Sequence, residues 1–145
     1  MRLEAKNSFD KTFYVVEYNQ TLDLIDTHWD GYASQQDLRV ACGMGLELLE
    51  KTRCAFKLND NSHQSGPWSQ AVEWLEEEWL PRAMQAGLKY LAHVANKHSY
   101  GETAGDVMHI SKIGKQLQYR MFFFREDALA WLKACQELEQ SAVLS

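Results

Sequence analysis

The feature that most constrains the fold is the alternation of short apolar segments with amphipathic helical stretches along the 145 residues. Runs rich in β-branched and aromatic residues, bounded by turn signals, predict strands over residues 13–18, 22–29, 54–58, 90–94 and 118–124. Apolar residues at helical spacing predict helices over residues 34–51, from about 68 to 87, over 103–114 and from about 126 onward. The element order is therefore β-β-α-β-α-β-α-β-α.

This order predicts one α/β domain over residues 1–145, built on a single mostly parallel sheet of about five strands. Strand–helix–strand units form parallel sheets with right-handed crossovers. The short joint at Asn19 and Gln20 predicts a hairpin between the first two strands. We therefore expect the first strand to run antiparallel at an edge of the sheet, and residues 1–11 to form a loosely ordered N-terminus.

The first predicted helix carries its own start signal. Ser34 has the position of an N-cap, and Asp37 three residues later resembles the second half of a capping box. Gly43 and Gly45 lie inside this helix, where each costs about 1 kcal/mol relative to Ala. We expect both glycines to allow a close approach of the helix to the sheet.

The second and last predicted helices each show one apolar stripe. Pro81 should kink or restart the second helix, and Gly87 should end it. Trp74 lies off the stripe among glutamates, so we expect it to be partly exposed and available for contact with a partner. The stripe of the second helix comprises Trp68, Val72, Leu75 and Trp79. The buried face of the last helix should comprise Ala128, Trp131, Leu132, Cys135 and Leu138.

Charge and composition narrow the class of partner. A net charge of −5 and an isoelectric point near 5.5 disfavour a nucleic-acid-binding surface. No apolar run approaches the ~20 residues that span a bilayer, which predicts no membrane insertion. Cys42, Cys54 and Cys135 lie at or beside predicted apolar positions, and no signal peptide opens the chain. Reduced thiols and a cytoplasmic location are therefore expected.

No motif for catalysis or cofactor binding is complete. The five histidines show none of the spacings that hold a metal, so we expect no metal site. The glycines at 43 and 45 lie within a predicted helix rather than in a phosphate-binding loop. No cysteine has the sequence context of a nucleophile. The sequence thus predicts no cofactor and no catalytic residues.

A polar segment, residues 59–67, follows the predicted strand 54–58 and precedes a helix. Open α/β sheets bind ligands at the carboxyl ends of their strands, which makes this segment the first candidate binding site. The alternative is that its Asn, Asp and Ser residues only form turns and cap the helix. The candidate binding residues here are Asn59, Asp60, Asn61, Ser62 and His63.

Several short motifs resemble a family of small STAS-like proteins, related in fold to anti-sigma-factor antagonists. They are Trp29-Asp30-Gly31, Lys57 to Asn61, Trp79 to Arg82, Gly87-Leu88-Lys89 and Phe124 to Leu132. The resemblance covers nearly the whole chain from about residue 12 and implies a STAS-like fold. Antagonists of this type carry a phosphorylatable serine in an Asp-Ser-Ser stretch. That stretch is absent here, and Ser62 is the closest positional match, which implies Ser62 as a possible phosphorylation site.

Two functional hypotheses follow. The first is a non-catalytic binding or regulatory module that recognises a protein partner, or a second copy, through residues 59–67 and the following helix with Trp74. The alternative is a small-molecule-binding domain or modest enzyme with a pocket at the strand carboxyl ends, where Asp60, Asn61, His63 and Arg82 supply polar groups. A pocket larger than ~300 Å³ beside these groups would favour the alternative. A flat surface with an exposed Trp74 would favour the first.

Overall fold

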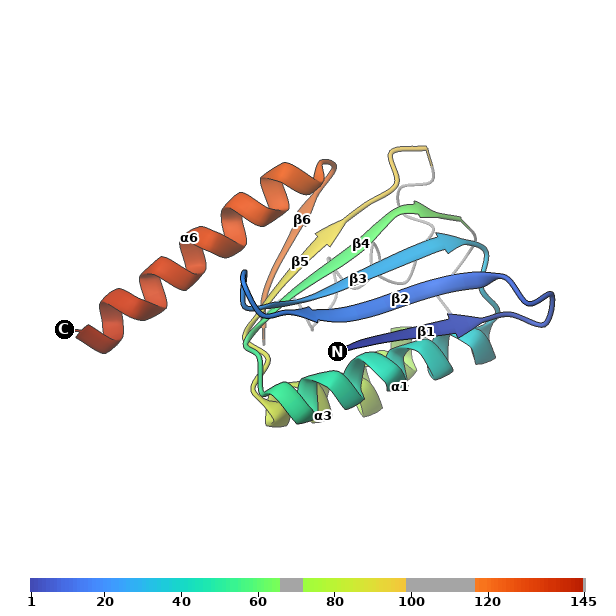
Figure 1. Cartoon of the computed structure of the whole chain (residues 1–145), viewed down its shortest axis with the longest axis horizontal. Helices are drawn as coiled ribbons and strands as arrows, with labels where there is room; N and C mark the ends of the chain where they lie inside the picture. The colour runs from blue at the N-terminus through green and yellow to red at the C-terminus, as the bar shows by residue number, and fades with distance from the viewer. Residues whose placement is uncertain (66–71, 99–116, 145) are drawn as a thin grey trace.

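A computed structural model describes residues 1–65, 72–98 and 117–144. Its centre is a six-stranded sheet in the order β1-β2-β3-β4-β5-β6 (Figure 1). The strands β1, β2 and β3 pair antiparallel, whereas β3, β4, β5 and β6 pair parallel. The predicted α/β class is therefore confirmed. The strands are β1 (Arg2–Lys6), β2 (Thr12–Asn19), β3 (Leu24–Gly31), β4 (Phe56–Gln64), β5 (Tyr90–Val94) and β6 (Gln118–Phe122).

The N-terminus differs from the expectation of a loosely ordered segment. Arg2–Lys6 forms β1, which pairs with β2, so the described sheet has six strands rather than about five. The antiparallel strand β2 consequently lies inside the sheet instead of at its edge. The pattern of β1 alternates, with Ala5 buried and the charged residues outward, which is typical of a half-buried strand and is a signal that the sequence does contain.

Helices cover the two faces of the sheet unequally. The helix α1 (Gln35–Thr52) and a second helix lie on one face, here called the helical face, while α6 (Arg125–Leu144) covers part of the other, the α6 face (Figure 1). The second helix consists of α2 (Val72–Trp74), a π-helical turn η2 (Leu75–Trp79) and α3 (Leu80–Ala86). The predicted helix over 103–114 and the positions of Trp68 and residues 66–67 lie outside the described residues.

The start of α1 confirms the predicted capping box. Ser34 Oγ accepts a hydrogen bond from the Asp37 amide at 3.0 Å, and the Asp37 carboxylate accepts one from the Ser34 amide at 3.2 Å. The close approach expected at Gly45 is also confirmed, because a Cβ added there would lie 2.7 Å from Tyr14 Oη. The same expectation is wrong for Gly43, where an added Cβ would meet nothing within 4 Å.

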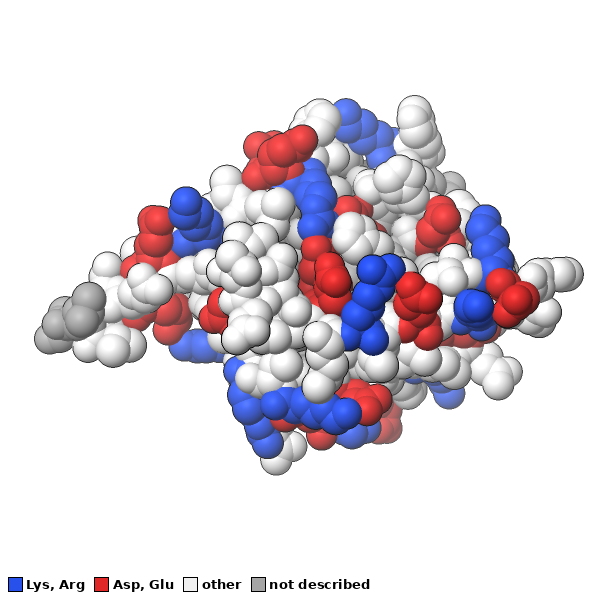
Figure 2. Space-filling model, in the orientation of Figure 1, with Lys and Arg blue, Asp and Glu red and all other residues white. Residues whose placement is uncertain are grey.

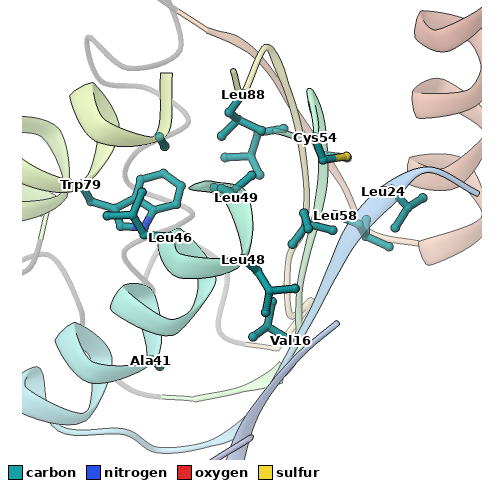
Figure 3. Close-up of a cluster of buried hydrophobic side chains, with 14 of the residues drawn as sticks. Val16, Leu24, Ala41, Leu46, Leu48, Leu49, Cys54, Leu58, Trp79 and Leu88 are labelled. Carbon is teal, nitrogen blue, oxygen red and sulfur yellow. The ribbon is translucent and has the colours of Figure 1, made fainter. Parts of the chain in front are cut away.

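Leucines of α1 form the centre of the core (Figure 3). Leu46 lies beside the Trp79 ring, and Leu48 points toward Val16 of the sheet. The burial of Leu75 and Trp79 confirms the part of the predicted stripe whose side chains the structure describes, and Trp79 Nε1 donates a hydrogen bond to the Cys42 carbonyl at 3.0 Å. Each fully buried leucine contributes roughly 1.5–3 kcal/mol, so this layer fixes the second helix against α1.

The second helix restarts at Pro81, as expected. Pro81 has no amide hydrogen, and the turn before it widens so that the Leu80 amide bonds to the Leu75 carbonyl five residues back. Gly87 ends α3 with φ +117°, a left-handed conformation that favours glycine. The next strand, β5, can therefore begin only three residues later.

The last helix confirms most of its predicted stripe. Ala128, Leu132 and Cys135 are buried, and Trp131 is half-buried. Leu138 was wrongly assigned to the buried face, since it is 69% exposed. Neighbouring residues of α6 still reach the sheet, since Glu139 accepts a hydrogen bond from Tyr90 Oη at 2.6 Å, so Leu138 lies on the outward side of the helix.

None of the helices in the described residues covers β1 and β2 on the α6 face. Figure 2 shows acidic and basic side chains interleaved on the side of the molecule that carries these strands. Arg2 pairs with Glu4 at 3.0 Å, for example.

All three cysteines are free thiols. No helix in the described part of the chain combines the length and apolar character needed to cross a bilayer.

Candidate functional site

The first part of the predicted polar loop, residues 59–64, forms a strand instead of a loop. Residues 59–64 continue β4, so the predicted strand end was wrong. His28 pairs with Asp60 and Asp30 with His63, which gives β4 one extra residue and therefore a bulge. The bulge shifts the alternation of side chains, so that His63 is exposed and Gln64 is buried.

Asp60 belongs to an ionic cluster on the α6 face, here called the Arg125 network. Arg125, the first residue of α6, bonds to both carboxylate oxygens of Asp26 and to Asp60 Oδ2 at 3.3 Å. His28 Nε2 lies 3.3 Å from Asp26 Oδ1, and its Nδ1 lies 3.8 Å from Asp60 Oδ2. The two aspartates are buried, so this network ties β3 and β4 to the start of α6.

The network shifts the protonation of its members. Burial opposes ionisation of Asp26, but hydrogen bonds from His28 and Arg125 outweigh burial and hold the pKa of Asp26 below its usual range. The hydrogen bond to Asp26 raises the pKa of His28, against the opposing effect of burial. Both shifts favour the charged forms, which is the behaviour of a structural ion cluster.

Ser62 and His63 lie next to this network without forming a catalytic triad. Ser62 Oγ donates to Asp60 Oδ1 at 2.6 Å, and it lies 3.2 Å from His63 Nδ1. In a serine nucleophile system the carboxylate orients the histidine. Here Asp60 contacts the serine itself, so nothing in this contact set orients His63 as a base. Phosphorylation of Ser62 stays a prediction.

The amides Asn59 and Asn61 project to the opposite, helical face of the sheet. Asn59 Oδ1 accepts hydrogen bonds from Thr27 Oγ1 and Trp29 Nε1, both at 3.0 Å. Its Nδ2 lies 3.2 Å from Nδ1 of the buried His93. Asn59 is therefore a structural link between β3, β4 and β5. The candidate residues of β4 thus divide between two faces and do not form one site.

Trp74 and Arg82 lie apart from these residues. Trp74 is half-buried, and the Arg39 guanidinium lies 5.4 Å from the centre of its ring. Arg82 is exposed on α3 and pairs with Glu50 at 3.0 Å. The structure does not bring Arg82 together with Asp60, so the pocket proposed for these two groups is wrong.

Exposed aromatic rings occur where the parallel strands end. Tyr32 follows β3 and is 60% exposed, while Phe123 and Phe124 follow β6 and are 41% and 52% exposed. Lys97 Nζ lies 3.8 Å from the centre of the Phe124 ring. Parallel strands end at one edge of their sheet, so these rings share that edge with the end of β4. We call this the carboxyl-edge surface, made of Tyr32, Ser62, His63, Phe123 and Phe124.

Sequence reasoning missed the residues that organise this region, although signals for them exist. Asp26 and His28 stand two apart in a strand, so they share a face. Arg125 directly follows the last predicted strand, at the edge where parallel strands end. Lys57 lies inside a short apolar strand, and its burial follows from that position.

In the part of the chain that the structure describes, no three His, Cys, Asp or Glu residues are grouped to hold a metal ion.

Comparisons of the chain with protein-family models, with curated proteins and with solved structures found no match. The resemblance to STAS-like proteins therefore rests on the sequence motifs alone and stays a prediction. The chemistry of the edge must be argued from its own residues. These are exposed rings, a hydroxyl and an imidazole, and the hydroxyl of Ser62 contacts Asp60 of the buried ionic cluster.

Proposed function

We propose that this chain is a non-catalytic binding module that recognises a protein partner through the carboxyl-edge surface. The observation that carries the proposal is the exposure of Tyr32, Phe123 and Phe124 at one edge of the sheet. Large rings left open to water at one edge are typical of contact sites, because their burial against a partner is favourable. Aromatic residues are also enriched among the residues that dominate binding energy.

The Arg125 network supports the same proposal, because it provides a firm base for the rings. Phe124 immediately precedes Arg125, whose guanidinium is anchored by Asp26 and Asp60. Preorganised side chains lose less conformational entropy on binding than mobile ones. The ring of Phe124 is therefore presented from an anchored position at the start of α6.

Ser62 and His63 add polar groups to the middle of the surface. His63 is exposed and Ser62 is half-buried, between the ends of β3 and β5 in the sheet order. A contact surface of rings with intervening polar groups fits a protein partner, whose core contacts are apolar and whose rim is hydrated. This assigns recognition to the strand ends and gives Trp74 only a minor role.

Substitution of the rings tests this function. A Tyr32→Ala/Phe124→Ala double variant should lose partners that the wild-type chain retains from an extract of its source cells. The matched control is Phe9→Ala, since Phe9 is 89% exposed but lies in the turn between β1 and β2. Surface truncations of this kind change stability by about 0.5 kcal/mol or less, so all three proteins should melt alike.

Mass spectrometry of the retained proteins and sedimentation of the purified chains give the readout. We expect specific partners, or a second copy of the chain, to be lost from the double variant and kept by Phe9→Ala. Retention of the same partners by the double variant would contradict the proposal. Equal loss from the Phe9→Ala control would show nonspecific adhesion of exposed rings instead.

A further inference from the structure

A small cavity lies on the helical face of β4, opposite the Arg125 network. It has a volume of about 50 Å³ and lies between the sheet, α1 and η2. It is separate from the carboxyl-edge surface, because its polar residues project from the other side of the strand. We call it the Lys57 cavity; the residues that matter for its chemistry are Lys57, Asn61, Gln64, Cys42 and Trp79.

Lys57 places a positive charge in this cavity without a counter-ion. Lys57 is only 6% exposed, and it forms no ion pair with any described carboxylate. Its Nζ lies 4.6 Å from the centre of the Trp79 ring, which offers partial compensation through a cation–π contact. A buried ammonium group without an anionic partner is costly, and it is the group that a bound anion would satisfy.

The ionisable neighbours of Lys57 do not supply that anion. Burial raises the pKa of the Cys42 thiol to about 12, and it raises the pKa of Tyr14 well above its usual value. Both groups are therefore neutral at physiological pH. Burial also lowers the pKa of Lys57 to about 8, so the neutral and the charged form of this lysine coexist near pH 8.

Asn61 supplies an unmet acceptor in the same cavity. Asn61 is 3% exposed, and its Oδ1 accepts no hydrogen bond from any described residue. Its Nδ2 is already committed to Gln64 Oε1. A buried acceptor without a donor is rare and unfavourable, so Asn61 Oδ1 is the group that a hydroxyl donor would satisfy.

We propose that the Lys57 cavity binds a small hydroxycarboxylate, with its carboxylate on Lys57 Nζ and its hydroxyl donating to Asn61 Oδ1. Lys57 and Asn61 stand four residues apart on one strand, so their Cα atoms are roughly 13 Å apart. Both side chains leave the same face of β4 and line the same cavity, so a small acid can lie between their polar atoms. A cavity of about 50 Å³ has no room for a larger metabolite.

Calorimetric titration of the wild-type chain with 3-hydroxypropionate at pH 8 tests this site. We expect saturable binding with a dissociation constant of about 1 mM or below, in the range open to a ligand of so few atoms. Binding of the carboxylate should raise the pKa of Lys57. Titrations in buffers of different ionisation enthalpy should therefore show uptake of about half a proton per ligand at pH 8.

Two matched compounds separate the two contacts. Butyrate replaces the hydroxyl by a methyl group, and 3-hydroxypropionamide removes the charge while keeping the hydroxyl. We expect each to bind at least about 10-fold more weakly than 3-hydroxypropionate. Equal binding of butyrate would overturn the role of Asn61, and equal binding of the amide would overturn that of Lys57. Absence of any binding up to about 50 mM ligand would overturn the site as a whole.

The variant Lys57→Met should abolish both the binding and the proton uptake. Its matched control is Lys89→Met, because Lys89 is an exposed lysine whose partner is Glu139, away from the cavity. Proton uptake that persists in Lys57→Met would contradict the proposal. Should that variant fail to fold, the compound series and the proton uptake of the wild-type chain decide the question without it.

Discussion

Lys57 and Arg125 show two opposite ways of placing a cation in this protein. Arg125 is anchored by two buried carboxylates, whereas Lys57 lies among neutral groups and an indole ring. The first arrangement holds elements together, because its charges satisfy one another. The second costs stability, because only the indole ring compensates the buried charge. The effects of replacing these residues should therefore have opposite signs.

Replacement of Arg125 by Ala should destabilise the protein. It leaves Asp26 and Asp60 buried close together without their main cation, and we expect a loss of about 2–3 kcal/mol. This is less than for a fully buried pair, since a third of the Arg125 side chain meets solvent. Arg82→Ala, which breaks only the exposed pair with Glu50, should cost about 1 kcal/mol or less. Urea unfolding checks both; equal losses would refute the structural role of the network.

Replacement of Lys57 by Met should stabilise the protein at neutral pH. The pKa of Lys57 is about 8 in the folded chain, below its ordinary 10.5, so the unfolded chain binds more protons between these values. The contribution of Lys57 to the free energy of unfolding therefore rises with pH from about 8 to 10.5. Below pH 8 its burial lowers the free energy of unfolding by the full amount, roughly 3 kcal/mol.

The variant Lys57→Met is free of that cost but loses the contact with the Trp79 ring. We expect a net gain of about 1–3 kcal/mol at pH 7. The gain should shrink as the pH approaches 10. Urea unfolding of both proteins at pH 7 and pH 10 measures it. A variant less stable than wild type at pH 7, or a difference that does not depend on pH, would show that Lys57 is not a destabilising buried charge.

At the level of the elements, local signals in the sequence sufficed where a single residue defines a boundary. Ser34 with Asp37, Pro81 and Gly87 each act within a few residues of themselves, so their structures could be predicted. The extension of β4 could not be predicted in this way. Its second half consists of residues typical of turns, and pairing with β3, together with pairing to β5 as far as Asp60, holds them in a strand.

The two glycines inside α1 offer a matched test at this scale. Gly45→Ala should destabilise the protein by about 1–3 kcal/mol, because the new methyl group would meet Tyr14 Oη at 2.7 Å. Gly43→Ala should stabilise it by up to about 1 kcal/mol, since alanine favours a helix and nothing lies within 4 Å. Thermal unfolding compares them. A shift of the same sign in both variants would refute the close contact between α1 and β2.

At the scale of the whole molecule, the sheet is covered on one face by α1 and the second helix and on the other partly by α6 (Figure 1). The sequence predicts the layers, because alternating strands and helices leave few arrangements. It does not predict the carboxyl-edge surface. That surface depends on contacts such as Arg125 with Asp26, which are 99 residues apart in the chain.

The assembled edge is thus the part of the molecule on which the proposed function depends. Its rings come from the ends of β3 and β6, and the residues between them come from β4. A partner that binds there must shield the chain at these three places together. A partner that binds elsewhere must leave them unchanged.

Amide hydrogen exchange, measured on the chain alone and in complex with the partner that it retains, tests this claim most directly. We expect slower exchange in residues 30–34, 61–65 and 122–126, together with unchanged exchange in the turn at residues 7–11, which carries the exposed Phe9. Slower exchange confined to α1 and α3, with the carboxyl edge unchanged, would contradict the proposed binding surface.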